Sequence, residues 1–121
     1  MNGAQKIAKI LKANGIERVY YYPGGTVVPL LNALIEEGID FINTINEQGA
    51  GYAAIGAAKT SGKTQVVIVT SGPGATNALT PIADAYFDSV PIIIFTGQVV
   101  EKDMNYDKKV RQTGFQETDT V

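Results

Sequence analysis

The chain contains no cysteine, no histidine and no tryptophan. Without cysteine it can form neither a disulfide framework nor a cysteine-ligated metal site. Without histidine it lacks the commonest general base and transition-metal ligand. No apolar run reaches the roughly 20 residues of a membrane-spanning helix, and the first residues lack the apolar segment of a secretory signal. These absences favour a cytoplasmic protein that does not act at a membrane.

An excess of charge of one sign is also missing. The 121 residues include 10 basic and 12 acidic side chains, which give a net charge of −2 and are mixed along the chain. No basic block suggests nucleic-acid binding. The length and a hydrophobic share of 45% suit one compact domain with a real core. We therefore expect a single domain over residues 1–121.

Helical and extended patterns alternate along the sequence. Apolar stripes at helical spacing over 4–11, 27–34, 50–57 and 75–82 predict four helices, which end near Asn14, Gly38, Gly62 and Phe87. Runs rich in β-branched and aromatic residues predict strands over 18–22, 39–45, 65–70 and 91–96. Residues 66–69 and 92–95 are apolar on both faces, as in the middle of a covered parallel sheet. The alternation predicts an α/β fold in three layers, a parallel sheet flanked by helices.

The character of the chain changes after Gly97. Residues 98–114 are polar and charged without clear periodicity, so we predict a long exposed loop ahead of Phe115 and Gln116. A loop of that length in a compact domain is usually functional or disordered. The sequence then reaches Val121 without a clear closing element. We therefore expect the domain to be incomplete at its C-terminal end.

Three predicted strands are each followed by a turn with ligand-binding residue types. The turns are Tyr22-Pro23-Gly24-Gly25, Asn46-Glu47-Gln48-Gly49 and Thr70-Ser71-Gly72-Pro73-Gly74-Ala75-Thr76-Asn77. The carboxyl ends of parallel strands share one edge of a sheet, and ligands bind there in α/β folds. The three turns thus predict one site. Neither the P-loop pattern nor the dinucleotide fingerprint is present.

The residues alone leave simpler interpretations open. The glycine-rich turn could present backbone amides to a ligand or be only a tight turn. Glu47 could exchange a proton with a ligand, but the pattern alone favours an ordinary acid in a first helical turn. The three tyrosines at 20–22 more often line a sheet than a ligand. Asp84 and Asp88 are better explained as a solvated helix face than as metal ligands, and we predict no metal ligand in this chain.

Taken together, the motifs resemble the N-terminal pyrimidine-binding domain of thiamine-diphosphate enzymes of the acetolactate synthase type. Besides the three turns, the matching segments are Asp88-Ser89-Val90-Pro91, Thr96-Gly97-Gln98-Val99 and Phe115-Gln116-Glu117. Six motifs occur in order and cover nearly the whole chain. The resemblance implies the fold of that domain and thiamine diphosphate as the cofactor.

The resemblance also implies a role for each matched residue. Glu47 corresponds to the glutamate that hydrogen-bonds N1′ of the aminopyrimidine, which promotes the tautomer that removes the thiazolium C2 proton. It implies a cofactor-binding set, which is Tyr22, Pro23, Gly25, Thr70, Gly74 and Asn77. It implies a substrate-pocket set, which is Gly25, Thr26, Phe115 and Gln116.

The implied activity is that of a carboligase or decarboxylase acting on pyruvate-like 2-oxo acids. The chain departs from the family at Asn46, where histidine is usual, and at Thr26, where alanine is usual. The link from Gln98 to Phe115 is also longer. These departures concern the acceptor, because a related enzyme of the family transfers a two-carbon acyl unit to a keto-sugar.

The resemblance further implies what lies outside this sequence. The family's Gly-Asp-Gly…Asn domain, which binds Mg²⁺ and the diphosphate, does not occur in these 121 residues. FAD, where the family uses it, is held mainly by later domains. We therefore expect half a site, an inactive isolated chain, a diphosphate-binding domain or subunit as partner, and a homo-oligomer formed through the small-residue helix 49–60. A non-catalytic interaction module and a generic nucleotide-binding protein of the same fold class remain as alternatives.

Overall fold

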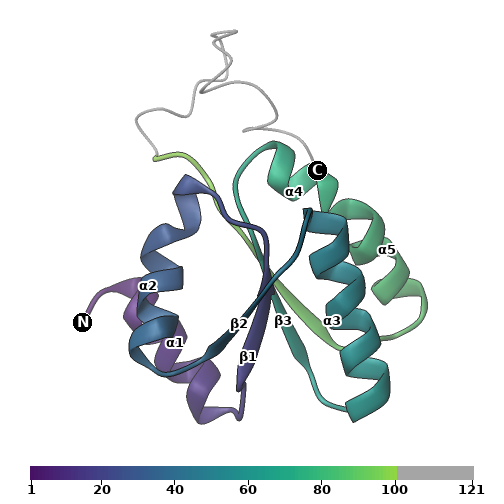
Figure 1. Ribbon diagram of the computed structural model, residues 1–121, viewed down its shortest axis with the longest axis horizontal. Coiled ribbons are helices and arrows are strands. Elements are labelled where there is room, and N and C mark those ends of the chain that lie inside the picture. The colour runs from purple at the N-terminus through teal and green to yellow at the C-terminus, as the bar shows by residue number, and fades with distance from the viewer. Residues whose placement is uncertain (101–121) are drawn as a thin grey trace, which may run out of the picture.

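A four-stranded parallel sheet lies between two layers of helices in the computed structural model, which describes residues 1–100 (Figure 1). The strands lie in the order β2-β1-β3-β4, and all neighbours pair in parallel. Their bounds are Arg18–Tyr21 for β1, Asp40–Asn43 for β2, Gln65–Val69 for β3 and Ile92–Thr96 for β4. The predicted three-layer α/β fold is confirmed. Within the described residues, no helix is long and apolar enough to cross a membrane.

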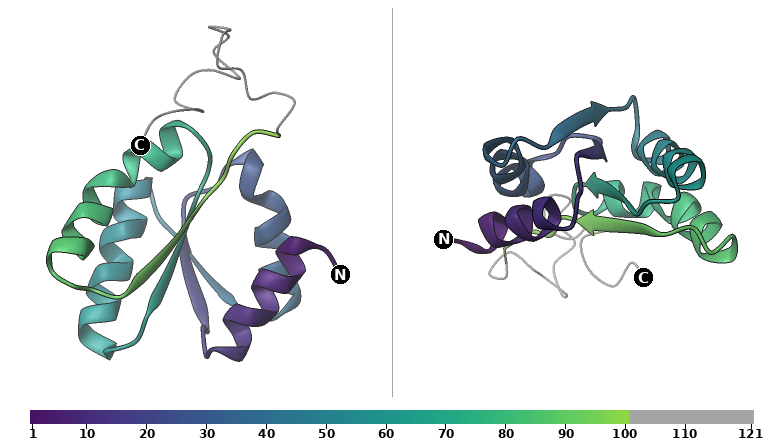
Figure 2. Two further views of the ribbon diagram at one scale, coloured as in Figure 1. Left: turned by 180° about the vertical axis from the view of Figure 1, so that it is seen from behind. Right: turned by 90° about the horizontal axis from the view of Figure 1, so that it is seen from below.

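Each face of the sheet is covered by two helices (Figure 2). The helices α1 (Gly3–Ala13) and α2 (Val28–Glu36) pack on Val19, Val66 and Ile68. On the other face, α3 (Glu47–Ser61) and α5 (Leu79–Phe87) pack on Tyr20, Val67 and Val69. A short 3-10 helix, η1 (Gly25–Val27), precedes α2, and a short helix, α4 (Pro73–Asn77), precedes α5. Alternate residues of β1 and β3 therefore supply the two halves of the core.

The helices begin and end where the sequence predicts turns. Asn2 and Gln5 form a reciprocal capping box at the start of α1, which satisfies two free backbone amides. Gly62 follows α3 with φ of 68°, a left-handed conformation that glycine adopts without strain. Helix α3 extends three residues before and four residues after the apolar stripe 50–57, and its first residue is Glu47. This start places Glu47 at the carboxyl edge of the sheet.

The two strands that are apolar on both faces occupy different places. Strand β3 is central, and its residues 66–69 are fully buried, as predicted. Strand β4 is at the edge of the sheet that the described residues form, and Ile93 is 39% exposed there. A central position was expected for both strands, so the expectation is confirmed for β3 and not for β4. An apolar run shows that a strand can be buried, but it does not show which neighbouring elements bury it.

The fourth predicted helix is divided into α4 and α5, and Ala78 lies between them. Pro81 explains the break, because proline has no N–H and its ring clashes with the carbonyl four residues earlier in a continuous helix. That carbonyl belongs to Asn77, the last residue of α4. The break leaves the Asn77 side chain free to turn toward α3, as described below.

Candidate functional site

The turns after all four strands meet at the carboxyl edge of the sheet, the upper edge in Figure 1. The Thr44 backbone amide and hydroxyl both donate to the Tyr21 carbonyl oxygen, at 3.1 and 3.2 Å. The Tyr22 amide donates to the Ile68 carbonyl oxygen at 3.3 Å. The Gly97 amide donates to the Val69 carbonyl oxygen at 3.0 Å. These bonds hold the turns in one group, as the parallel arrangement predicts.

Glu47 is buried at the centre of this edge, with 7% of its surface exposed. Asn46 caps α3 just before it, and the Asn46 side chain accepts a hydrogen bond from the Gly49 amide at 2.7 Å. The Asn77 side-chain amide donates to Glu47 Oε2 at 3.2 Å. Among the described residues, no donor reaches Glu47 Oε1. A buried carboxyl with one oriented and one open oxygen can accept from, or exchange a proton with, a ligand at Oε1.

Two threonines connect the first and third turns. The Thr26 and Thr70 hydroxyl oxygens are 3.0 Å apart and share a hydrogen bond. The Ser71 amide donates to Thr26 Oγ1 at 3.1 Å. A side chain at Gly97 would overlap Thr26, so the turn after β4 closes on the same pair. Thr26, which is predicted to border the substrate, thus links the first turn to the third turn at this edge.

Two glycines allow the turns near Glu47 to pack closely against Thr70. A Cβ atom at Gly74 would lie 2.7 Å from Thr70 Cγ2 and 3.6 Å from Glu47 Oε1. A Cβ atom at Gly24 would overlap the Thr70 side chain. The first and third turns therefore approach each other more closely than residues with side chains allow. The resulting edge is lined by backbone near an open carboxylate oxygen.

The structure brings some of the predicted site residues together and leaves others apart. Glu47, Thr70, Gly74 and Asn77 form one connected group, to which Thr26 is joined through Thr70. Tyr22 is partly buried next to this group, whereas Pro23 and Gly25 are exposed at the turn surface. Their predicted roles in binding the cofactor or substrate stay predictions. Phe115, Gln116 and most of the predicted loop 98–114 lie outside the described residues.

Two residues that hold the carboxyl edge together, Gly24 and Thr44, were not predicted from the sequence. Gly24, rather than Gly25, is the glycine that the close approach to Thr70 requires, because a Cβ at Gly25 meets nothing within 4 Å. Thr44 joins the second turn to the first through Tyr21. A glycine pair does not say which member faces a neighbour, so no signal in the sequence separates Gly24 from Gly25. Thr44 is a polar residue directly after β2, and this position at a strand end is a sequence signal that could have identified it.

The acids of α5 lie away from this edge. Asp88 accepts a hydrogen bond from Lys59 at 2.6 Å, and both side chains are about half exposed. The hydrogen bond from Lys59 to Asp88 raises the pKa of Lys59 above its usual value. This pair joins the end of α3 to the end of α5. The interpretation of Asp84 and Asp88 as a solvated helix face rather than as metal ligands stays a prediction.

Comparison with known proteins places the chain beside a described family. Residues 1–121 match the family described as "Thiamine pyrophosphate enzyme, N-terminal TPP binding domain". The acetolactate synthase large subunit of Lactococcus lactis is 51% identical over 121 residues, which is 99% of this chain and 20% of that protein. The isozyme 2 large subunit of Escherichia coli acetolactate synthase is 46% identical over 100% of this chain and 21% of its own length.

A mitochondrial relative extends the comparison. The acetolactate synthase catalytic subunit of Saccharomyces cerevisiae is 41% identical over 122 aligned residues, covering 100% of this chain and 17% of that protein. The chain thus spans about one fifth of the length of these relatives.

Proposed function

Because the chain belongs to the family of thiamine pyrophosphate enzyme N-terminal domains, we propose that it is the pyrimidine-binding part of a carboligase or decarboxylase acting on pyruvate-like 2-oxo acids. The acetolactate synthase subunits among its relatives support this choice of reaction. Only part of such an enzyme is contained in these residues. The activity proposed is that of the complete enzyme, and the isolated chain is expected to be inactive.

The open oxygen of Glu47 is the observation on which the proposal depends. A buried carboxylate oxygen without a donor costs free energy, and a ligand that donates to it offsets that cost. Among the described residues, Glu47 Oε1 lacks a donor, while Oε2 is held by Asn77. A Cβ atom at Gly74 would lie 3.6 Å from Oε1, so glycine at this position leaves the approach to that oxygen free of a side chain. A protonatable ring nitrogen, such as that of an aminopyrimidine, fits this arrangement.

The residues of the edge have distinct tasks in this account. Glu47 holds or moves a proton at Oε1, and Asn77 orients the carboxyl group through Oε2. Gly24 and Gly74 let the backbone approach the ring, and Thr70 fixes the distance between the two turns through Thr26. Thiamine diphosphate, when bound, supplies the carbanion-stabilising chemistry. The residues proposed to hold it are Tyr22, Pro23, Gly25, Thr70, Gly74 and Asn77.

The remaining parts of the site are proposed to come from outside the described residues. A diphosphate-binding domain or subunit, with Mg²⁺, would complete the cofactor site, and Gly25, Thr26, Phe115 and Gln116 would border the substrate. A homo-oligomer in the cytoplasm is the proposed form, and FAD is an additional cofactor to be tested by its absorbance in the purified protein. The greater length of the relatives supports the proposal that further domains complete the site.

The function is tested by assaying the protein, purified at its natural length, for release of CO₂ from pyruvate with and without thiamine diphosphate and Mg²⁺. We expect cofactor-dependent release. Product analysis with a second pyruvate or a keto-sugar as acceptor then separates an acetolactate synthase from a two-carbon transferase. A protein that binds no thiamine diphosphate and decarboxylates no 2-oxo acid would instead be a non-catalytic interaction module of the same fold.

A further inference from the structure

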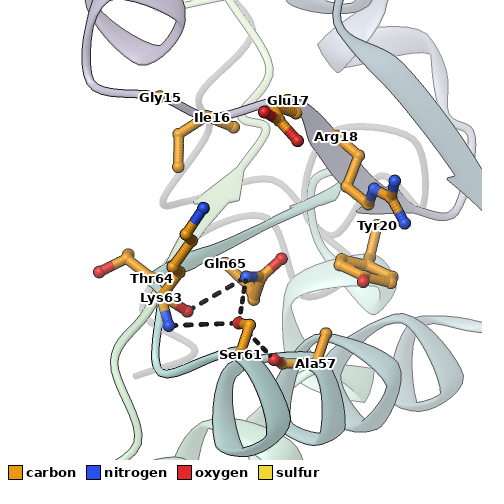
Figure 3. A pocket seen from close by; sticks show the side chains of 10 residues that line it. All are labelled: Gly15, Ile16, Glu17, Arg18, Tyr20, Ala57, Ser61, Lys63, Thr64 and Gln65. Carbon is orange, nitrogen blue, oxygen red and sulfur yellow. Dashed lines mark hydrogen bonds between the residues drawn. The ribbon is translucent and has the colours of Figure 1, made fainter.

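A pocket, called the second pocket to distinguish it from the site around Glu47, lies at the opposite edge of the sheet, where β1 and β3 begin and α3 ends (Figure 3). Its volume is about 220 Å³. One wall is the turn before β1, from Gly15 to Arg18, and the other is the turn from Ser61 to Gln65. Ala57 and Tyr20 lie between the two walls. The pocket shares no residue with the carboxyl edge, so its role is independent of the proposed function.

Hydrogen bonds fix the wall that follows α3. The Ser61 hydroxyl donates to the Ala57 carbonyl oxygen at 2.7 Å and accepts from the Lys63 amide at 3.2 Å. The Gln65 side-chain amide donates to the Lys63 carbonyl oxygen at 3.1 Å and to Ser61 Oγ at 3.4 Å. These bonds, drawn as dashed lines in Figure 3, hold the turn in one conformation. The wall is therefore formed before any ligand binds, which lowers the entropy lost on binding.

Tyr20 contributes a buried polar group to the pocket. Its side chain is only 7% exposed, and its ring packs with Ala50, Ala54 and Val67. Within the described part of the chain, its hydroxyl has no hydrogen-bond partner. Tyrosine hydroxyls that are buried normally have a partner, and an unpartnered one is costly. A phenylalanine would fill the same apolar space without that cost, so the hydroxyl indicates a partner that enters the pocket.

The charges around the pocket favour an anion. In Figure 3 the Arg18 and Lys63 side chains come from opposite sides of the pocket, and Glu17 is the single acid in its lining. Arg18 lies two residues before Tyr20 on β1, so both side chains face α3. Within residues 1–100, neither Arg18 nor Lys63 forms an ion pair. Asp40, on the neighbouring strand β2, is the residue paired in register with Arg18. Two cations against one acid give the lining side chains a net positive charge, which counters the negative ends of the α1 and α3 dipoles at this edge.

We propose that this pocket binds a small oxyanion, a carboxylate or a phosphate, through Arg18 and the Tyr20 hydroxyl, with Lys63 adding positive charge from the opposite wall. The arginine guanidinium matches the paired oxygens of either group. The Tyr20 hydroxyl donates to the same anion, which gives that buried group its partner. The apolar remainder of an organic anion packs against Ile16 and Ala57. The site lies at the far edge of the sheet from Glu47, where a bound anion does not contact the proposed cofactor.

The test measures binding of inorganic phosphate and of acetate to the purified protein by titration calorimetry at constant ionic strength. Thiamine diphosphate and Mg²⁺ are present in excess, so that any diphosphate site is already filled. The variants are Tyr20→Phe, which removes only the hydroxyl, and Arg18→Gln, which removes one cation. Lys6→Gln on α1 is the matched control, because it removes an exposed cation away from the pocket.

We expect saturable binding of at least one anion, weakened about tenfold by Tyr20→Phe and by at least as much by Arg18→Gln. The Lys6→Gln variant is expected to bind like the wild type. The tighter of the two probes identifies the chemical class of the natural ligand. Absence of saturable binding to the wild type would overturn the proposal. Equal affinity in Tyr20→Phe, Arg18→Gln and the wild type would also overturn it, because these residues would then have only a structural role.

Discussion

Glu47 owes its place to Asn46, the residue directly before it. The Asn46 side chain accepts from the Gly49 amide and begins α3, so Glu47 becomes the first helical residue and turns into the carboxyl edge. The strand-turn-helix pattern predicts a carboxyl group at this edge. Its partner does not follow from the pattern, because Asn77 is 30 residues away and reaches Glu47 only through the packing of α4 on α3. The sequence therefore predicts the acid but not its orientation.

The capping role of Asn46 can be tested by its effect on stability. Asn46→Ala removes the bond to the Gly49 amide and is expected to lower the free energy of unfolding by about 1 kcal/mol. Asn46→Asp keeps an acceptor at the same position and is expected to retain most of the stability. Urea unfolding followed by circular dichroism measures both variants. Equal stability of Asn46→Ala and the wild type would show that the cap does not hold α3.

The two neighbouring glycines of the first turn are expected to respond differently to the same substitution. Gly24→Ala places a methyl group onto Thr70, and we expect a loss of about 1 to 3 kcal/mol in the free energy of unfolding. Gly25→Ala meets nothing within 4 Å and is expected to change that free energy by less than about 0.5 kcal/mol. Both are measured by the same denaturant titration. A more damaging Gly25→Ala would contradict the close approach of Gly24 to Thr70.

At the scale of elements, α3 is the helix that joins the two edges of the domain. It begins at Glu47 and ends beside the second pocket, and its small residues pack against β3, β1 and α5. Small residues let this helix approach α5 closely, as at Gly51, where a side chain would overlap Pro81. The same small residues, Ala50, Ala54 and Ala58, are buried inside the domain. They are therefore not free to form the oligomer contact expected for residues 49–60, and only the outer face around Tyr52 is left.

The contact between α3 and α5 can be tested with two glycines of one helix. Gly51→Ala forces a methyl group against Pro81, so we expect a loss of about 1 to 3 kcal/mol in the free energy of unfolding. Gly56→Ala has open space around it and should gain up to about 1 kcal/mol from the higher helix propensity of alanine. Thermal unfolding of the two variants measures the difference. If both shift the melting temperature in the same direction, the contact is not as described.

Sequence periodicity predicted every strand and most of every helix, since the apolar stripes follow from burial on one face. Two features at this scale depend on non-local packing and were not predicted. The division at Ala78 depends on Pro81, and the apolar stripe gives no sign of it because the stripe continues through the break. The edge position of β4 depends on strand order, which no local pattern encodes.

At the scale of the whole molecule, the described residues expose several large apolar side chains. Ile45 is 90% exposed, Phe87 83% and Tyr86 79%, and Ile93 on the edge strand is also accessible. Exposed apolar groups of this size favour association. We expect sedimentation velocity to show that the 121-residue chain, expressed alone, self-associates as its concentration rises. A monodisperse monomer at high concentration would contradict this prediction.

The central claim concerns the complete enzyme, and one substitution tests it most directly. Glu47→Gln keeps the size of the side chain and its contact with Asn77 but removes the proton-exchanging group at Oε1. Glu36→Gln, at the exposed end of α2, is the matched control. Both are made in the protein at its natural length, and turnover is measured as thiamine-diphosphate-dependent release of CO₂ from pyruvate. We predict that Glu47→Gln lowers turnover by about 10² to 10⁴ while Glu36→Gln leaves it unchanged. Wild-type turnover in the Glu47→Gln protein would contradict the assignment.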